Sequence, residues 1–351
     1  MYKKLLCVIC LQTNRVNNVV SKQKNIWWHD KMEFINEKIG LKSSDIKSAN
    51  PSNNFVMPFY LTGSPIQETP KIRGRICRLT TPITQIIDRH NYPDTINLKL
   101  AEAMAITACL STTFKLNGVI TLQAKGDGPL RTLFCDVSKD GHIRSYAAFD
   151  ENALGSEQIL QDTSLTTLMG GGYMAFTIEQ DGPNKRYQGI VELCGKTVKD
   201  SVIAWFKNSE QINTEFISMA RKQDGSWVAA TLLLQKLADK GGLEDILKHD
   251  DIETWKKAKL FANSSTISEM LNPNLKLEIL LFRLFNELGV YIQPSRLIID
   301  RCRCNNDKVE TLLRSISKDE LVNLVDENDN IVVDCEFCKK RRIFSSNLKV
   351  H

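Results

Sequence analysis

The sequence predicts an α+β fold built from three successive parts, and three observations lead to this prediction. Residues 52–237 alternate short apolar runs with turn sequences, which is typical of antiparallel sheets with packed helices. Residues 238–298 change to a charged helical pattern, which predicts a helical linker. Residues 299–351 are too few to enclose a large apolar core, yet they contain four cysteines in two close pairs.

An N-terminal extension precedes these parts. Residues 1–51 are rich in Lys, Asn and Ser and have little apolar periodicity, so we expect this segment to be poorly ordered. Cys7 and Cys10 have CxxC spacing, but the residues between them are apolar and no second pair lies nearby. Chance explains this spacing best.

The core domain, residues 52–237, is expected to contain antiparallel strands joined by tight turns. Two clear strand candidates are Asn117–Ala124 and Tyr173–Ile178. Between them lies Leu98–Phe114, where Ala and Leu alternate with few charges, so we expect a helix that is buried on most sides. Turn signals occur at Gly126–Pro129, Asp140-Gly141 and Asp181–Asn184.

The linker, residues 238–298, is predicted to hold three helices. Asp250-Asp251 can cap a first helix that runs through Lys259, and Ser264-Ser265 can cap a second that contains Glu269. A third runs from Leu275 to Leu288. Because charged residues are numerous in the first helix, this segment has little core of its own, and we expect its order to be conditional.

The C-terminal domain, residues 299–351, is predicted to hold two short helices and a strand. One helix has an apolar face made by Val309, Leu312, Leu313 and Ile316. Ser317-x-x-Glu320 predicts a capping box for the second, and Ile331–Val333 predicts the strand.

Composition and charge exclude several classes of protein. The net charge of the 351 residues is +5, with acidic residues interspersed, so charge alone supports neither a nucleic-acid nor a membrane partner. No run approaches the ~18 apolar residues that a membrane span needs. The start of the chain has a charged and then an apolar piece but no Ala-x-Ala type cleavage site, so export is not expected.

The cysteines point to a reducing compartment. Four of the ten lie singly in apolar or mixed runs, which predicts buried thiols rather than a disulfide framework, and a cytoplasmic location follows: Cys77, Cys109, Cys135 and Cys194.

The strongest chemical signal is the pair of motifs Cys302-Arg303-Cys304 and Cys335-Glu336-Phe337-Cys338. Each short spacing keeps two sulfurs near one ion, and zinc prefers soft sulfur ligands in tetrahedral geometry. We therefore expect Cys302, Cys304, Cys335 and Cys338 to bind one zinc ion. Four protein ligands leave no open position for water, which disfavours hydrolytic zinc catalysis.

A closed zinc–thiolate site has two uses, a structural clamp or a redox switch. The spacing alone cannot choose between them, and the clamp is the favoured interpretation at this point. Metal binding is part of the folding of so small a domain, so oxidation that removes the ligands would also unfold it.

No other motif predicts an enzyme. His90 lies near Asp88, but nothing supplies a nucleophile, and a histidine at a helix end explains the pattern better. The loops Gly126–Gly128 and Gly170–Gly172 do not match a Walker sequence, so turn glycines are expected there.

Several phrases in a fixed order resemble the heat-shock protein 33 family of bacterial redox-regulated holdase chaperones. The resemblance covers about residues 52–345 and rests on Asn54–Phe59, Arg73–Arg75, Arg78–Thr80, His90–Pro93, Leu122–Pro129, Tyr187–Val191, Ser209–Thr214, Leu281–Glu287 and the two cysteine motifs.

The resemblance implies an ATP-independent chaperone that is inactive when reduced and zinc-loaded. Oxidation would form the disulfides Cys302–Cys304 and Cys335–Cys338, eject the zinc, unfold the C-terminal domain and loosen the metastable linker. The exposed apolar surface would then hold unfolding client proteins, and the active form would be a homodimer. This implication reverses the preference for a clamp and makes the protein a non-enzyme that protects against oxidative and heat stress.

The sequence departs from the family pattern at two positions. Lys339 stands where a glycine usually follows the last cysteine, and Arg342 stands where an aromatic residue usually precedes the final apolar one. Ligation should survive, while the stability of this turn should change.

Two other classes of function are consistent with part of the sequence. The basic run Lys339–Arg342 could make the chain a zinc-ribbon nucleic-acid-binding protein with a purely structural zinc, although a solvated surface run is the better interpretation. A thiol oxidoreductase is the third class, but the sequence lacks a thioredoxin-like βαβ context.

Overall fold

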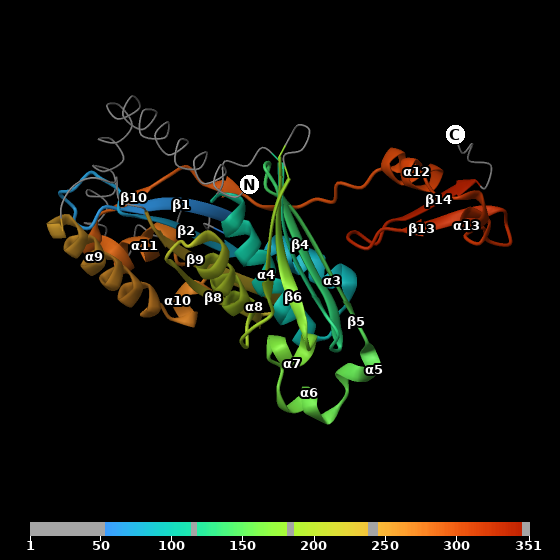
Figure 1. The fold of residues 1–351 in the computed structure, drawn as a ribbon, viewed down its shortest axis with the longest axis horizontal. Helices are drawn as coiled ribbons and strands as arrows, with labels where there is room; N and C mark the ends of the chain where they lie inside the picture. The colour runs from blue at the N-terminus through green and yellow to red at the C-terminus, as the bar shows by residue number, and fades with distance from the viewer. Residues whose placement is uncertain (1–52, 114–117, 181–185, 238–244, 346–351) are drawn as a thin grey trace. The chain divides into compact units, whose positions relative to one another are not determined.

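A computed structural model of the chain describes residues 53–113, 118–180, 186–237 and 245–345 (Figure 1). The chain divides after Asn50 into two units, and all the described residues belong to the second. The expected extension at residues 1–51, with Cys7 and Cys10, lies outside the described residues. So do the expected turn at Asp181–Asn184 and the tail from residue 346 onward.

The core of the second unit contains two six-stranded sheets. Sheet A has the order β10-β1-β2-β9-β8, and β11 also pairs with β1. All its pairs are antiparallel, and its strands are β1 (Phe55–Leu61), β2 (Ile72–Leu79), β8 (Thr214–Gln223), β9 (Ser226–Lys236), β10 (Val290–Ile292) and β11 (Arg296–Leu297).

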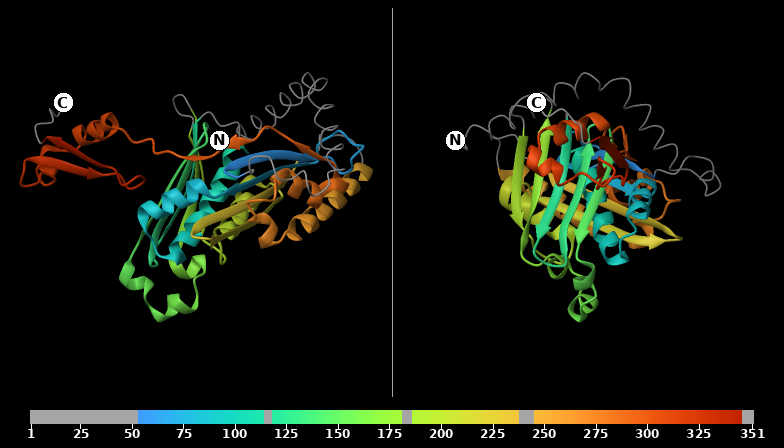
Figure 2. Two further views of the ribbon diagram at one scale, coloured as in Figure 1. Left: turned by 180° about the vertical axis from the view of Figure 1, so that it is seen from behind. Right: turned by 90° about the vertical axis from the view of Figure 1, so that its right-hand side faces the viewer.

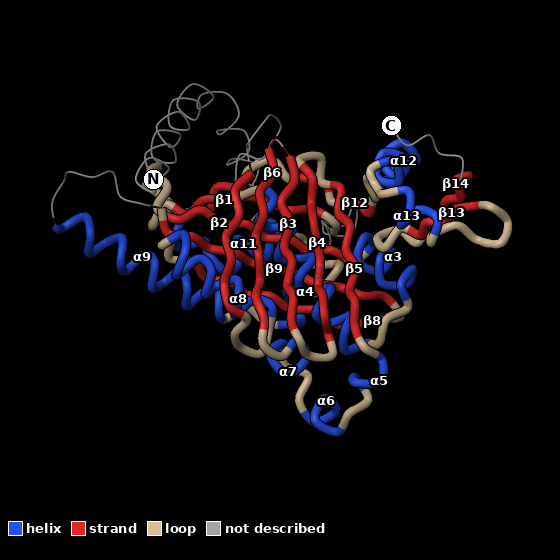
Figure 3. Tube along the Cα trace, turned by 45° about the vertical axis from the view of Figure 1, so that its right-hand side comes forward, coloured by secondary structure: helices blue, strands red, loops and turns tan. Residues whose placement is uncertain are grey.

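Sheet B has the order β12-β5-β4-β3-β6-β7, and its long strands lie side by side in Figure 3. Its pairs are antiparallel except that β12 runs parallel to β5. Its strands are β3 (Gly118–Gly126), β4 (Leu130–Ser138), β5 (His142–Phe149), β6 (Gly172–Gln180), β7 (Arg186–Glu192) and β12 (Ile299–Asp300). The two strands predicted from the sequence are β3 and β6, and the expected turns at Gly126–Pro129 and Asp140-Gly141 join β3 to β4 and β4 to β5.

One buried helix packs against strands of both sheets. This is α4 (Asp94–Ser111), which was predicted at Leu98–Phe114 and is buried at fifteen of its positions. Its small and aliphatic side chains let the strands approach it closely on several sides. Two neighbouring helices, α3 (Thr81–His90) and α8 (Val198–Trp205), complete this core, and a π-helical turn at Phe206–Glu210 follows α8. His90 ends α3 as expected, with Asn91 as a left-handed cap.

Three short helices connect β5 to β6: α5 (Glu151–Leu154), α6 (Glu157–Gln161) and α7 (Leu165–Met169). The predicted glycine turn Gly170–Gly172 follows α7 and leads into β6 rather than into a helix N-terminus, which agrees with the absence of a phosphate loop.

The linker helices pack on sheet A (Figure 2). They share a second cluster of buried apolar side chains with it. They are α9 (Asp245–Asn263), α10 (Ile267–Met270), α11 (Leu277–Phe285) and a 3₁₀ turn at Asn286–Leu288. Gly74 in β2 makes room for this packing, because a Cβ there would lie 2.0 Å from the ring of Phe59. Phe59 in turn stacks on Phe285 of α11, with 5.9 Å between ring centroids.

Two predicted helix starts in the linker were wrong. Asp250 and Asp251 lie inside α9, which begins at Asp245. The second helix is capped by Thr266 and not by Ser264-Ser265, because Thr266 and Glu269 satisfy each other's backbone N–H groups in a reciprocal capping box.

The C-terminal region forms the two predicted helices and the predicted strand, and a second strand that was not predicted pairs with it as a hairpin. They are α12 (Asn306–Arg314), α13 (Lys318–Val322), β13 (Asn330–Asp334) and β14 (Arg341–Ser345). Ser317 accepts a hydrogen bond from the Glu320 N–H, which confirms Ser317 as the N-cap of α13. The expected apolar face is only partly buried, since Leu313 is enclosed while Leu312 is 61% exposed. None of the described helices combines the length and the apolar character that a bilayer crossing requires.

Candidate metal centre

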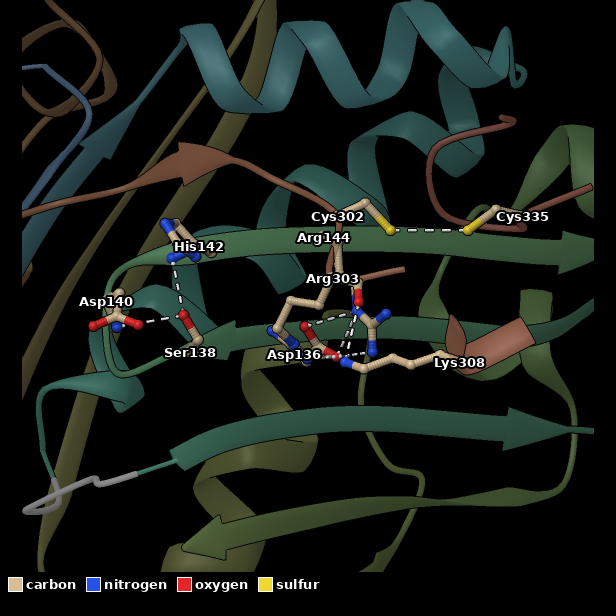
Figure 4. A network of polar contacts seen from close by, with 9 residues as sticks. All are labelled: Asp136, Ser138, Asp140, His142, Arg144, Cys302, Arg303, Lys308 and Cys335. Atoms are coloured by element: carbon tan, nitrogen blue, oxygen red, sulfur yellow. Dashed lines mark hydrogen bonds and ion pairs between the residues drawn. The ribbon is translucent and has the colours of Figure 1, made fainter. Parts of the chain in front are cut away.

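The four predicted cysteines converge on one point. The Sγ atoms of Cys302, Cys304, Cys335 and Cys338 all lie within 4.8 Å of one another, and all four side chains are partly buried. The Sγ atoms of Cys304 and Cys338 are 3.4 Å apart. Those of Cys302 and Cys335 are 3.8 Å apart, and Figure 4 shows this pair. In the described part of the chain, no other group of three or more Cys, His, Asp or Glu side chains converges in this way.

Two different elements deliver the sulfur pairs. Cys302 and Cys304 lie in the short segment between β12 and α12. Asn305, the next residue, caps α12 by accepting a hydrogen bond from the Lys308 N–H at 2.9 Å. Cys335 and Cys338 lie in the turn between β13 and β14. This turn is closed by hydrogen bonds from the Lys339 N–H to the Cys335 carbonyl at 2.8 Å and from the Cys335 N–H to the Lys340 carbonyl at 3.2 Å. We call residues 335–340 the CxxC turn.

The pKa values of Cys304 and Cys335 are shifted in opposite directions. Burial and the neighbouring cysteines raise the pKa of Cys304 to about 12. Burial also acts to raise the pKa of Cys335, but hydrogen bonds from the backbone of Cys338 and Phe337 and from neighbouring cysteines outweigh it and lower that pKa to about 7. Backbone N–H groups at a CxxC turn therefore favour a thiolate before any metal is present.

The basic run after the last cysteine is not a free surface. The Arg342 side chain is buried and donates to Cys304 Sγ at 3.0 Å and to Asn306 Oδ1 at 3.0 Å. Arg341 pairs with Asp334, and Lys339 with Glu336, each at 2.9 Å. The interpretation of Lys339–Arg342 as a solvated run was therefore wrong for Arg342, which sequence alone could not place against a sulfur.

A buried carboxylate joins the centre to sheet B (Figure 4). The Asp136 side chain on β4 is only 2% exposed, and it accepts from Arg144 of β5 at 2.9 Å and from Arg303 at 2.7 Å. Burial would lower the pKa of Arg144, but Asp136 and Cys302 outweigh it and raise that pKa. Sequence reasoning missed Asp136 and Arg144; the one available signal was the charged residue Arg303 between two cysteines.

Phe337, between the second pair of cysteines, also contacts the core. Its ring packs against Phe134 and Tyr146, and its carbonyl lies within hydrogen-bond distance of Arg89 and His90 at the end of α3. Burial and nearby cations lower the pKa of His90, so a neutral imidazole that donates from Nε2 fits this contact. His90 is thus a helix-end residue with a structural contact, as the sequence indicated.

The remaining cysteines of the described residues play no part in the cluster. Cys77, Cys109 and Cys135 are buried free thiols, as predicted, and burial raises the pKa of Cys109 and Cys135 well above the usual range. Cys194 differs from the prediction because it is only partly buried.

Four thiolates at these separations fit a tetrahedral ion such as zinc, whose bonds to sulfur are about 2.3 Å. The donor set is complete without water. The arrangement can therefore hold a metal and exchange it for disulfides, but it offers no open coordination position for hydrolysis.

The comparisons with known proteins all match the same family. The family model described as Hsp33 protein matches residues 65–345. The 33 kDa chaperonin of Caulobacter vibrioides is 30% identical over 279 residues, covering 78% of this chain and 90% of that protein. The 33 kDa chaperonin of Pseudomonas fluorescens is 32% identical over 277 residues, covering 78% and 87%.

A solved structure has the same fold. The crystal structure of the 33 kDa chaperonin of Thermotoga maritima superposes with a TM-score of 0.66 and covers 83% of this chain and 94% of that one. Its sequence identity is 19%, so the likeness supports the fold.

Proposed function

We propose that this chain, which belongs to the Hsp33 family of chaperones, is a redox-regulated and ATP-independent holdase. In this proposal Cys302, Cys304, Cys335 and Cys338 bind one zinc ion in the reduced state. The observation that carries the proposal is the convergence of these four sulfurs. The first two of them directly follow β11 and β12, which pair with sheet A and sheet B respectively.

A bound zinc ion would hold four thiolates together and fix the C-terminal fold. The protein supplies the rest: Arg342 donates to Cys304, and the backbone of the CxxC turn donates to Cys335. The backbone donors favour the thiolate at Cys335, which is the form that reacts with an oxidant.

The switch is a two-electron oxidation of each cysteine pair. Two thiols lose two protons and two electrons to one molecule of hydrogen peroxide, which is reduced to two molecules of water, and one S–S bond forms. The pairs would be Cys302–Cys304 and Cys335–Cys338, as in the family. Loss of the ligands then removes what orders residues 299–351.

The parts have separate roles in the proposal. Residues 52–237 form the chaperone core, residues 238–298 the metastable linker on sheet A, and residues 299–351 the zinc-binding switch. Clients are unfolding proteins, the oxidised form is a homodimer, and the protein acts in the cytoplasm by binding rather than by catalysis.

The test is light scattering from a chemically unfolded client diluted into buffer. The full chain is added either reduced and zinc-loaded or pre-treated with peroxide at an unfolding temperature. Suppression by the oxidised form alone supports the proposal. Equal suppression by both forms, or by neither, contradicts it.

A matched variant identifies the sensor. Cys302→Ser with Cys335→Ser should abolish both zinc binding and the dependence on peroxide, while Cys194→Ser should change neither. Persistence of the peroxide response in the double variant would show that the sensor lies elsewhere. The nucleic-acid alternative receives no support, because Arg341 and Arg342 are engaged within the chain.

A further inference from the structure

Sheet B carries an aromatic site on the face that meets the CxxC turn. Phe134 of β4 and Tyr146 of β5 are directly paired across the strands and stack with 5.5 Å between ring centroids. The ring of Phe337 meets both nearly edge-on, at 5.3 Å from Phe134 and 5.0 Å from Tyr146. Edge-on aromatic contacts at these distances are favourable beyond simple burial.

The third wall of this site is a cation. The guanidinium carbon of Arg144 lies 3.9 Å from the centroid of the Phe337 ring, and Asp136 fixes that guanidinium from the other side. A cation held over a ring face selects an aromatic side chain over an aliphatic one of similar size.

The site also binds the main chain of the residue it holds. The Phe337 carbonyl accepts from Arg89 Nη1 at 3.3 Å, and His90 Nε2 lies 3.2 Å from the same oxygen. Arg89 is itself fixed by Asp300 of β12. Every residue of a polypeptide has such a carbonyl, so these two contacts do not depend on the sequence around Phe337.

We propose that Phe134, Tyr146, Arg144, Arg89 and His90 form a binding site for one aromatic residue of an unfolded polypeptide, which Phe337 fills as an internal ligand. We call these five residues the aromatic site. The inference rests on the proposed holdase function and adds to it a client surface and the client chemistry: an aromatic ring together with its own backbone carbonyl.

The position of Phe337 makes occupancy depend on the metal centre. Phe337 lies between Cys335 and Cys338, so binding of a metal by these two cysteines would also hold the ring in place. When the turn changes shape on oxidation, the ring leaves, and the same contacts become available to a client residue.

The experiment uses a ten-residue Gly/Ser peptide with one p-benzoylphenylalanine, photo-cross-linked to the full chain and mapped by mass spectrometry. Reduced, zinc-loaded wild type should give no cross-links within β4 and β5. Phe337→Ala, with its zinc content verified, should give them without any oxidant. A competing peptide with Phe should displace the probe about fivefold better than the same peptide with Leu.

A second comparison tests the aromatic site even if Phe337→Ala loses its zinc. Oxidised wild type should cross-link within β4 and β5, and Tyr146→Ala should lower this yield about fivefold or more. Tyr173→Ala is the matched control on the same sheet, since Tyr173 is 41% exposed and lies outside the aromatic site; it should change nothing. Equal yields for Tyr146→Ala and wild type would overturn the proposal.

The two proposals fail separately. If the oxidised protein suppresses client scattering but cross-links only outside β4 and β5, the aromatic site is wrong and the holdase function stands. If reduced Phe337→Ala cross-links there but no oxidised form suppresses scattering, the holdase function is wrong and the site stands.

Discussion

Lys339 occupies the left-handed region of backbone space, with a φ of 54°, directly after the last cysteine. This conformation costs a residue with a Cβ about 1 kcal/mol and costs glycine little. The family glycine at this position is therefore explained by the geometry of the CxxC turn, and its replacement by lysine weakens the turn.

Lys339→Gly should therefore strengthen metal binding. A gain of about 1 kcal/mol corresponds to about fivefold tighter zinc binding. The lost ion pair with Glu336 is exposed and should offset little of this gain. A chromogenic zinc chelator measures the affinity by competition. Lys340→Gly is the control, since Lys340 has no positive φ; equal gains for both variants would refute the explanation.

Asp136 is the carboxylate on which the junction with sheet B depends. Asp136→Asn removes the carboxylate that Arg144 and Arg303 share, and because both arginines retain some exposure, the free energy of unfolding should fall by about 2 kcal/mol. Urea unfolding measures the loss. Asp334→Asn removes an exposed partner of Arg341 and should have no measurable effect. Similar losses for both variants would rule out a special role for Asp136.

Some of these residues could be predicted from the sequence and others could not. The four cysteines are predictable because CxC and CxxC spacings bring sulfurs together locally, whatever the fold. Asp136, Arg144 and Phe134 are not, because their meeting with residues 303 and 337 depends on strand register and on the parallel pairing of β12 with β5.

At the scale of elements, Arg78 is the main polar contact between β2 and the linker. It is fully buried and donates to the carbonyls of Met270 at 2.7 Å, Leu275 at 2.7 Å and Glu269 at 3.1 Å. These carbonyls end α10 and precede α11, so one side chain holds the connection between two linker helices.

Arg78→Met should loosen the linker without unfolding sheet B. The change keeps the volume but leaves three carbonyls without their donor, which should cost about 3 kcal/mol locally. Tryptic cleavage after Lys276, next to Leu275, should become much faster. Arg221→Met, on the exposed part of β8, is the control and should leave the cleavage rate unchanged. An unchanged rate for Arg78→Met would contradict the prediction and would show that the apolar packing of α10 and α11 is sufficient to hold the linker.

The prediction of elements succeeded where the pattern was long and failed at helix ends. Leu98–Phe114 and the two strands were placed within a few residues, since buried faces fix their periodicity. The linker helix starts were wrong because several Asp, Ser and Thr residues there could each act as a cap. Only the folded structure shows which pair, Thr266 and Glu269, closes the capping box.

At the scale of the whole molecule, the three parts differ in how much apolar core they have. Both sheets enclose large clusters, whereas the C-terminal region buries only Leu313, Leu321 and Ile331 among its described apolar residues. So small a core cannot offset the entropy of ordering the region, and the proposed zinc ion would supply the difference.

Removal of the metal should therefore unfold one part first. A zinc chelator under reducing conditions should raise amide exchange throughout β13 and β14 while β3 to β6 keep their protection. Hydrogen exchange with mass spectrometry measures this by segment. A variant with all four ligand cysteines changed to serine should already show the exposed pattern without chelator. Unchanged protection of β13 and β14 after metal loss would contradict this account.

The segment that runs from β10 to the metal centre also sets the order in which strands detach under force. β10 and β11 pair with β1, and β12 pairs with β5 through only two residues, Ile299 with His142 and Asp300 with Ile143. Tension applied from the C-terminus reaches β12 first and the longer pairing of β10 last. Force would thus act along this segment in one direction, from the cysteines toward α11. A pull from the C-terminal end would separate β12 from sheet B before it separates β11 and β10 from sheet A.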